Sequence, residues 1–383
     1  MPPSLMALFA ALGALFGASG GGGGGDSSSS DATSSPDSAP SGSGSFITIS
    51  SDPIDIPASY SASAAPVSLG WGGLSAEEQL IVELINRARL DPDAEADRLG
   101  VDLVGSVSSS PKEALAVIPE LSAASEEHSE DMDDRNFFAH TNPDGQSPSD
   151  RAIEAGYGQG AGENLSVIGS SWTGYDKQER VETHHENLWG SSGHQKNMMN
   201  GNWNEIGVGN DYGTYKGLAG SSYITEMFGK TGEDYLTGVA FEDKDGDAFY
   251  DMGEGMGGVR VTAFKDGEKY ETATWDSGGY TLALDSGTYT IIFEGGSLDE
   301  AYVTEVTMGN KNVKLDLIET TDGLQLASMN GGTLQSSLDT SAALAYEDPL
   351  LSDLLVDTGE PGWEDTPPPD DGLDEDEGAG FFA

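Results

Sequence analysis

The sequence of 383 residues has no cysteine and very few basic residues. Without cysteine there are no disulfide bonds, thiolate metal sites or cysteine nucleophiles, so stability must come from packing or bound ions. Lysine and arginine number 17 against 66 aspartate and glutamate residues, a formal charge of −49. We therefore expect no nucleic-acid partner, because phosphate binding needs a basic surface. The acidity fits either a solubility or saline adaptation or the binding of divalent cations.

The chain also lacks a clear membrane-spanning run. The apolar run at residues 4–17 has signal-peptide length and is too short to span a bilayer comfortably. We predict a signal-peptide-like segment over residues 1–20, export to the cell surface or exterior, and no transmembrane helix in the mature chain. Gly, Ser, Asp and Pro dominate afterwards, which predicts a flexible linker over residues 21–73.

Ordered structure is predicted to begin at Ser75. Ser75 and Glu78 have the spacing of a capping box, and apolar residues then recur at helical spacing until Pro92. Periodicity predicts further helices over residues 121–135 and 178–189, and strands over residues 205–211 and 221–229. Helices followed by short strands predict an α+β or α-β-α domain that ends near Lys230.

Histidine is concentrated in this region. Four of the five histidines fall between residues 136 and 209: His140, His184, His185 and His194. Histidine is the side chain whose ordinary pKa lies near neutrality, so the clustering favours a functional site. Helical spacing places His185 on a core-facing stripe. The remaining one, His128, lies on the apolar side of its helix, where a packing role is favoured over a ligand role.

Several phrases around these histidines form a recognisable series. They are "LINRARLDP", "HSEDM", "FFAHTNPDGQSPSDR", "AGYGQGAGENL", "LWGSSGHQKNMM" and "WNEIGVG". In this order they resemble the CAP superfamily (SCP-like domain), and more closely its cysteine-free bacterial branch. The resemblance covers the predicted domain at residues 74–231, and it implies an α-β-α sandwich with a cleft lined by histidines and carboxylates.

The resemblance also implies which residues line that cleft. His140 and His194 match the family's two histidines, and Glu163 matches one of its two glutamates. Ser191 stands where the second glutamate is expected, and His185 is the candidate to complete the cleft instead. His140, Glu163 and His194 would suit Zn²⁺ or a similar ion with open coordination positions. A hydrogen-bonded network that only holds the cleft together is the equal alternative.

Catalysis is less favoured than either interpretation. Hydrolysis would need an aimed nucleophile or a metal-bound water, and the sequence has no Ser-His-Asp or HExxH arrangement. Within the resembled family, proteolysis, lipid or sterol carriage and signalling have each been proposed for different members. Membership alone therefore fixes no activity.

Residues 235–318 read differently, as seven short β-runs punctuated by Gly and Asp, which predict a small β-sandwich over residues 232–319. Its first runs flank the phrase "DKDGDAFYDMGE", which has the ligand spacing of an EF-hand loop. The predicted calcium ligands are the side chains of Asp243, Asp245, Asp247, Asp251 and Glu254 and the carbonyl of Phe249.

This stretch resembles the B-type, prealbumin-like repeats of bacterial SD-repeat surface proteins. The resemblance implies Ca²⁺ binding by the loop and a role as a rigid spacer, and a solvated acidic turn is the alternative. The predicted architecture is thus α+β: a CAP-like α-β-α sandwich, a small all-β Ig/prealbumin-like sandwich, and disordered acidic termini. The tail is predicted over residues 320–383.

The leading hypothesis is non-catalytic recognition of an extracellular ligand, which could be a lipid, peptide or glycan. The CAP-like cleft would bind it, and the Ca²⁺-stabilised β-sandwich would act as a stiff mount. The alternatives are a metal-dependent hydrolase using His140, Glu163 and His194, and a surface structural or adhesive protein with a vestigial cleft.

Overall fold

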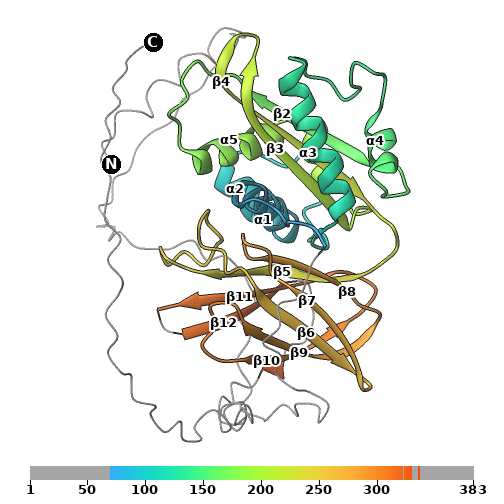
Figure 1. Ribbon diagram of the computed structural model, residues 1–383, viewed down its shortest axis with the longest axis vertical. Coiled ribbons are helices and arrows are strands. Elements are labelled where there is room, and N and C mark those ends of the chain that lie inside the picture. Colours follow the sequence, from blue (N-terminus) through green and yellow to red (C-terminus); the bar gives the residue numbers. More distant parts are fainter. Residues whose placement is uncertain (1–69, 322, 330–334, 337–383) are drawn as a thin grey trace, which may run out of the picture. The chain divides into compact units, whose positions relative to one another are not determined.

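The computed structural model describes residues 70–321, 323–329 and 335–336 (Figure 1). The predicted signal-peptide-like segment and nearly all of the predicted linker lie outside these ranges. No helix in the described part of the chain is long and apolar enough to cross a membrane.

The N-terminal part, to residue 229, alternates helices with the strands of one sheet. Its elements are α1 (Ala76–Leu90), α2 (Pro92–Leu99), β1 (Ala116–Val117), α3 (Pro119–Asp134), α4 (Pro148–Glu154), β2 (Gly162–Ile168), α5 (Lys177–Trp189), α6 (Ser192–Met198), β3 (Glu205–Tyr215) and β4 (Leu218–Gly229). The predicted helices and strands are confirmed, and the Ser75–Glu78 capping box is formed. The sequence reasoning did not predict the short helices α2, α4 and α6.

The sheet of this part has the strand order β1-β3-β4-β2 and helices on both faces (Figure 1). Ile206 and Phe228 share an apolar cluster with α1 and α5, whereas Met227 packs with α3. Helix α3 approaches the sheet very closely, because a Cβ at Gly207 or Gly209 would lie 2.1 Å from the α3 backbone. Glycine is therefore required where this helix crosses β3.

Helix α1 is buried on nearly all sides rather than along one stripe. Its apolar face packs into the N-terminal part, and polar residues of its other face contact the C-terminal part. Trp275 donates from Nε1 to Gln79 Oε1 at 3.0 Å, and Lys314 Nζ lies 2.8 Å from Glu83 Oε2. An amphipathic helix normally leaves its polar face to solvent. Here that face is buried and each of these polar groups has a partner.

The C-terminal part is all β. Its strands are β5 (Tyr235–Glu242), β6 (Val259–Lys265), β7 (Glu268–Ala273), β8 (Gly279–Ala283), β9 (Gly287–Gly295), β10 (Tyr302–Met308), β11 (Val313–Thr320), β12 (Gly323–Met329) and β13 (Gln335–Ser336). They form two sheets, with the orders β12-β11-β5-β8 and β13-β10-β9-β6-β7. Residues of both sheets contribute to one apolar cluster, which includes Ala240, Ile291 and Leu317.

The predicted end of this β part at residue 319 was too early. Strand β12 pairs antiparallel with β11, from Thr320 opposite Gly323 to Lys314 opposite Met329. The predicted acidic tail therefore begins with a hairpin strand, and the rest of that tail, beyond residue 336, lies outside the described residues. The seven predicted β-runs end at Ile318, so β12, which pairs with β11, was included in the predicted tail.

Candidate functional site

A half-exposed histidine lies on a buried ion pair beside the edge strand β2. His140 belongs to the loop between α3 and α4, and its Nδ1 lies 2.7 Å from Glu163 Oε1. The other oxygen of Glu163 accepts from Arg151 of α4, and the side chains of Glu163 and Arg151 are only 1% and 4% exposed. The His140 side chain is 56% exposed. Two buried charged groups therefore orient one accessible imidazole.

Arg151 also fixes the loop that carries His140. Its Nη1 donates to the backbone oxygens of His140 at 2.9 Å and of Gln146 at 3.1 Å. Helix α4 positions this arginine, and a capping box between Ser147 and Asp150 begins that helix. Arg151 was not among the predicted site residues, although it closes the phrase "FFAHTNPDGQSPSDR" that was used to recognise the region.

The electrostatics of His140 and His194 differ. The hydrogen bond to Glu163 raises the pKa of His140, whereas burial lowers the pKa of His194 and positive charge on His140 lowers it further. The backbone oxygen of His194 accepts from Asn164 at 3.3 Å, so His194 lies beside the residue that follows Glu163 in β2. Since Nδ1 of His140 faces a carboxylate, it carries the proton, and Nε2 is left to accept a hydrogen bond or bind a metal.

His185 lies apart from the other predicted cleft residues. Its Nε2 lies 2.7 Å from Glu95 Oε1, and both side chains are buried, with Arg98 on the same carboxylate at 2.6 Å. Burial alone would raise the pKa of Glu95, but the hydrogen bonds from His185 and Arg98 lower it below its usual value. The prediction placed His185 correctly on the inward stripe of α5, but its partner there is Glu95 of α2, a helix that the sequence reasoning missed.

The other two histidines are also interior groups. His184 lies between the hydroxyls of Ser166 and Ser222, at 2.7 Å from each, and burial lowers its pKa to about 3. His128 contacts the backbone oxygen of Ala139 through Nε2, and burial lowers its pKa to about 4. Ser191 is the N-cap residue of α6 and makes no side-chain capping bond.

The three predicted cleft residues do not form a converged metal-ligand set. Within the described ranges, there is one group of three His, Asp or Glu residues whose ligand atoms all lie within 4.8 Å of one another. This group is Asp243, Asp245 and Asp247. Both oxygens of Glu163 are already engaged. Glu163 is thus a residue that orients His140 rather than a direct ligand, which is the usual arrangement of a carboxylate behind a metal-binding histidine.

The acidic loop between β5 and β6 has a different character. Asp243 is buried, and its carboxylate accepts backbone hydrogen bonds from Gly246 at 2.8 Å and Ala248 at 3.3 Å. Asp245 and Asp247 are exposed and accept from the backbone two residues further on. The turn needs positive φ angles of 85° at Gly246 and 60° at Ala248. Local hydrogen bonds thus turn three carboxylates toward one point.

The remaining predicted calcium ligands have other contacts. Glu254 is buried and accepts from the backbone N–H groups of Lys244 and Asp251, which closes the loop. Asp251 accepts from Gln178 of α5 at 2.6 Å, and the ring of Phe249 lies 4.1 Å from the Arg87 guanidinium. Burial, then the neighbouring acidic groups of the loop, raise the pKa of Asp251 and Glu254.

One further buried carboxylate was not predicted. Glu226 of β4 is 1% exposed, accepts one hydrogen bond from Asn164 at 2.9 Å, and has no partner at Oε1. The same Asn164 amide donates to the backbone oxygen of His194 at 3.3 Å. Only tertiary pairing of β2 with β4 brings these residues together, so no local sequence signal could have found them.

Comparisons with known proteins agree with this description of the N-terminal part. Residues 82–223 match the cysteine-rich secretory protein family, CAP. The uncharacterized protein YkwD of Bacillus subtilis (strain 168) is 30% identical over 138 residues, which are 36% of this chain and 43% of YkwD. The chain thus spans less than half the length of that relative. Together these matches support a CAP (SCP-like) domain in this protein.

Two solved structures are also similar over 40% of the chain. One is an extracellular protein containing an SCP domain from Bacillus anthracis (strain Ames), 22% identical over 39% of its own chain, with a TM-score of 0.26. The other is an outer surface protein of Borrelia burgdorferi, 15% identical over 92% of its chain, with a TM-score of 0.27. The predicted likeness of the β part to SD-repeat B domains stays a prediction.

Proposed function

We propose that this is an exported bacterial protein whose CAP-type cleft binds an extracellular lipid, peptide or glycan without transforming it. The observation that carries the proposal is the geometry of His140. Its imidazole is more than half exposed, yet it is held by Glu163 and Arg151, which are almost fully buried. An oriented, accessible polar group on a rigid base is what selective recognition requires.

The same geometry argues against Glu163 as a catalytic base. A general base needs a free lone pair within reach of a substrate proton. Both oxygens of Glu163 are engaged, one by His140 and the other by Arg151. The only carboxylate that sequence reasoning assigned to the cleft is therefore a positioning group.

The five histidines provide a direct test by NMR of ¹⁵N-labelled histidine rings. The full chain is titrated with Zn²⁺, with a mixed peptide pool, with soluble glycan fragments and with phosphatidylglycerol vesicles. A cleft ligand should shift the ring signals of His140 and His194 and leave those of the interior His128, His184 and His185 in place. Shifts confined to the interior histidines, or no shift at His140 with any probe, would reject the cleft as a binding site.

Metal-dependent hydrolysis is the second candidate, and one observation favours it. His140 donates from Nδ1 to a carboxylate, which leaves Nε2 with the orientation and basicity of a metal ligand, and His194 is close by. A bound Zn²⁺ would supply an activated water. This candidate requires zinc in the native protein by elemental analysis, and turnover that His140→Ala removes while the far-UV and near-UV circular dichroism persist.

We further propose that the loop at residues 243–254 binds Ca²⁺ and stabilises the β part. The residues fit the ion, because oxygens within 4.8 Å of one another can share a Ca²⁺ at its usual bond lengths of about 2.4 Å. Hard carboxylate oxygens are also the donors that Ca²⁺ prefers. Asp243, Asp245 and Asp247 would hold the ion, and Glu254 would keep the loop closed behind it.

A further inference from the structure

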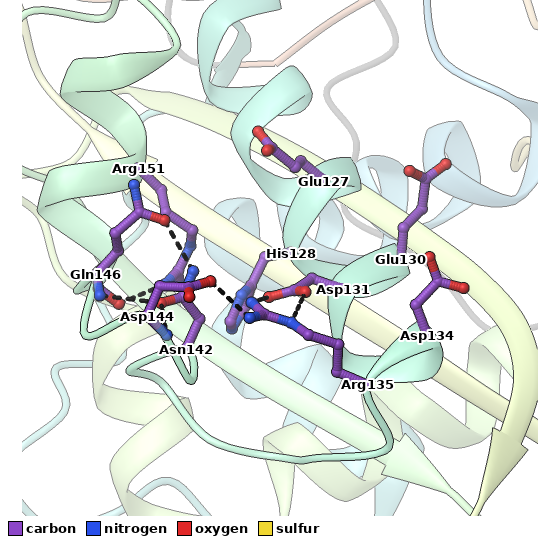
Figure 2. Close-up of a pocket in the computed structure, with 10 residues that line it drawn as sticks. All are labelled: Glu127, His128, Glu130, Asp131, Asp134, Arg135, Asn142, Asp144, Gln146 and Arg151. Atoms are coloured by element: carbon purple, nitrogen blue, oxygen red, sulfur yellow. Dashed lines mark hydrogen bonds and ion pairs between the residues drawn. The ribbon is translucent and has the colours of Figure 1, made fainter.

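A second concavity lies on the outer side of α3, apart from His140, Glu163 and His194. It is a pocket of about 310 Å³, formed by the C-terminal half of α3, the loop at residues 142–146 and Arg151 of α4 (Figure 2). None of the three predicted cleft residues lines it. Arg151 is shared with the His140 site, because it also pairs with Glu163, so the variants used below leave Arg151 in place.

The wall of the pocket is strongly acidic. Four carboxylates come from successive turns of α3 and a fifth from the facing loop: Glu127, Glu130, Asp131, Asp134 and Asp144 (Figure 2). Burial and the neighbouring acidic side chains, Glu126 and Asp211 foremost, raise the pKa of Glu130. The lining thus favours an occupant of positive charge.

The spread of these carboxylates argues against a metal ion. Among the described residues, the only three-carboxylate convergence within 4.8 Å is in the loop at residues 243–247, not here. A metal needs donors gathered around one point, whereas separated carboxylates match a cation that carries several N–H groups. The protein already places one such group in the pocket, because the Arg135 guanidinium bridges Asp131 of the helix and Asp144 of the loop (Figure 2).

A second, independent observation concerns the inner wall of the pocket. His128 is 0% exposed and contacts the backbone oxygen of Ala139 through Nε2, so Nε2 carries the proton. Its Nδ1 is therefore a bare acceptor, and it has no partner. An unmatched buried acceptor costs free energy that a ligand N–H would recover. Arg151 Nε, on the same wall, is an unmatched N–H donor that would suit a carbonyl oxygen.

We propose that this acidic pocket binds an organic cation bearing N–H donors, an alkylammonium or guanidinium group. A lysine or arginine side chain of a partner polypeptide and a free polyamine share this chemistry. The unmatched Arg151 Nε favours the polypeptide source, since a peptide brings a carbonyl oxygen with its cationic side chain.

Isothermal titration of the full chain at low ionic strength tests the proposal with four probes. N-acetyl-arginine amide and N-acetyl-lysine amide represent the polypeptide source, and 1,5-diaminopentane represents the polyamines. Tetramethylammonium has the charge but no N–H. The N–H cations should bind and tetramethylammonium should not. Tighter binding of the amides than of the diamine assigns a polypeptide partner, and the reverse order assigns a polyamine.

The pocket variant is Glu130→Gln/Asp134→Asn, which neutralises two carboxylates that have no hydrogen-bond or ion-pair partner within the described ranges. It should weaken binding about tenfold, because two nearby charges are removed. The matched control, Asp266→Asn/Glu268→Gln, removes the same charge from the exposed end of the β6–β7 hairpin and should leave binding unchanged. The control separates a local site from the general attraction of a chain with charge −49.

A third variant, His128→Phe, removes the unmatched acceptor and should reduce the preference for N–H cations over tetramethylammonium. The Glu130/Asp134 pair keeps the proposal testable if His128→Phe does not fold. Equal weakening by the pocket and control variants would overturn the proposal. So would binding of tetramethylammonium as tight as that of the amides, or no binding of any N–H cation at millimolar concentration.

Discussion

The proposed His140 cleft and the acidic loop at residues 243–254 differ in how their negative charge is paired. In the cleft, Glu163 is buried and both of its oxygens meet positively charged or N–H groups of His140 and Arg151. In the loop, Asp243, Asp245 and Asp247 face one another and accept hydrogen bonds from backbone N–H groups. The negative charge of the first region is paired within the protein, whereas that of the second would be balanced by the proposed Ca²⁺.

Because of this difference, we expect the stability of the two regions to depend on different solution conditions. A paired buried charge resists change, so the cleft should keep its geometry and respond chiefly to pH through His140. A cluster of like charges stores repulsion that an ion can release, so the loop should respond to Ca²⁺. Changing one partner at a time in each region tests the contrast.

The largest loss of stability is expected when the buried ion pair between Glu163 and Arg151 is broken. Glu163→Leu leaves the Arg151 guanidinium buried without its carboxylate, which should lower the free energy of unfolding by about 3–5 kcal/mol in urea denaturation. The double variant Glu163→Leu/Arg151→Met removes both charges and should recover a large part of that loss. A single-variant loss under about 1 kcal/mol would show that the pair does not hold the cleft together.

The second largest effect on stability is expected from Glu226, a buried carboxylate that has no ion-pair partner among the described residues. Burial raises its pKa from the ordinary 4.5 to about 7, although the hydrogen bond from Asn164 lowers it. An acid with a raised folded pKa is ionised first in the unfolded chain, so stability falls as pH rises from about 4.5 to about 7. By linkage the loss approaches about 3 kcal/mol above pH 7.

Glu226→Gln removes this titration. Between pH 4.5 and pH 8, the urea midpoint of the variant should rise relative to that of the wild type as pH increases. The exposed Glu268→Gln is the matched control and should run parallel to the wild type. If the curve of Glu226→Gln were also parallel, Glu226 would not be neutral in the folded protein.

Sequence reasoning could predict the local features of the N-terminal part but not its long-range contacts. The capping box at Ser75 and Glu78 and the helices over α3 and α5 could be predicted, because capping and periodicity are local. The assignment of His140 and Glu163 to one site followed from a resemblance, and their hydrogen bond is seen only in the structure. Local patterns could not show that His185 meets Glu95, because that contact spans 90 residues and depends on α2.

The same limit applies to the loop and to helix α1. Spacing grouped Asp243, Asp245 and Asp247, and the structure brings one oxygen of each within 4.8 Å of the others, because a tight turn of five residues leaves little freedom. Spacing also included Asp251, whose carboxylate instead accepts from Gln178, 73 residues earlier. Nothing local in α1 could show that its polar face is buried, since the partners Trp275 and Lys314 lie far along the chain.

The stabilisation of the protein by Ca²⁺ binding to the loop should be smaller than the two preceding effects. A ligand that binds only the folded state stabilises it by about 2.7 kcal/mol when its concentration is one hundred times the dissociation constant. Saturating Ca²⁺ should therefore raise the melting temperature, and excess chelator should reverse the rise. Asp245→Asn should abolish the response to Ca²⁺, since it removes one of the three converging carboxylates.

The stability of Asp245→Asn in the absence of Ca²⁺ provides a second test of the calcium proposal. In chelator the variant should be as stable as the wild type or slightly more so, because it relieves repulsion among the three carboxylates while its amide oxygen can still accept from the Asp247 backbone. Asp266→Asn, in an exposed turn elsewhere, should respond to Ca²⁺ as the wild type does. A melting temperature that ignores both Ca²⁺ and chelator would remove the calcium proposal.

The smallest effect is expected from the pH response of His140. Its hydrogen bond to Glu163 raises its pKa above the ordinary 6.5. A histidine with a raised folded pKa contributes stability that is full below the unfolded pKa and is lost as pH rises through the folded pKa. His140→Gln should therefore cost most near pH 5.5 and nothing measurable by about pH 8.5. Because the imidazole is half exposed, the difference should stay below about 1 kcal/mol.

The comparison of wild type with His140→Gln isolates this contribution. Burial lowers the pKa of His128 and His184, so both destabilise the protein on acidification below pH 6.5, but they do so equally in the two proteins and cancel in the difference. Urea midpoints at intervals from pH 5.5 to pH 8.5 provide the measurement. A cost that grows with pH would mean that Glu163 does not favour the protonated imidazole, and the cleft would then lose the charge pairing that sets it apart from the acidic loop.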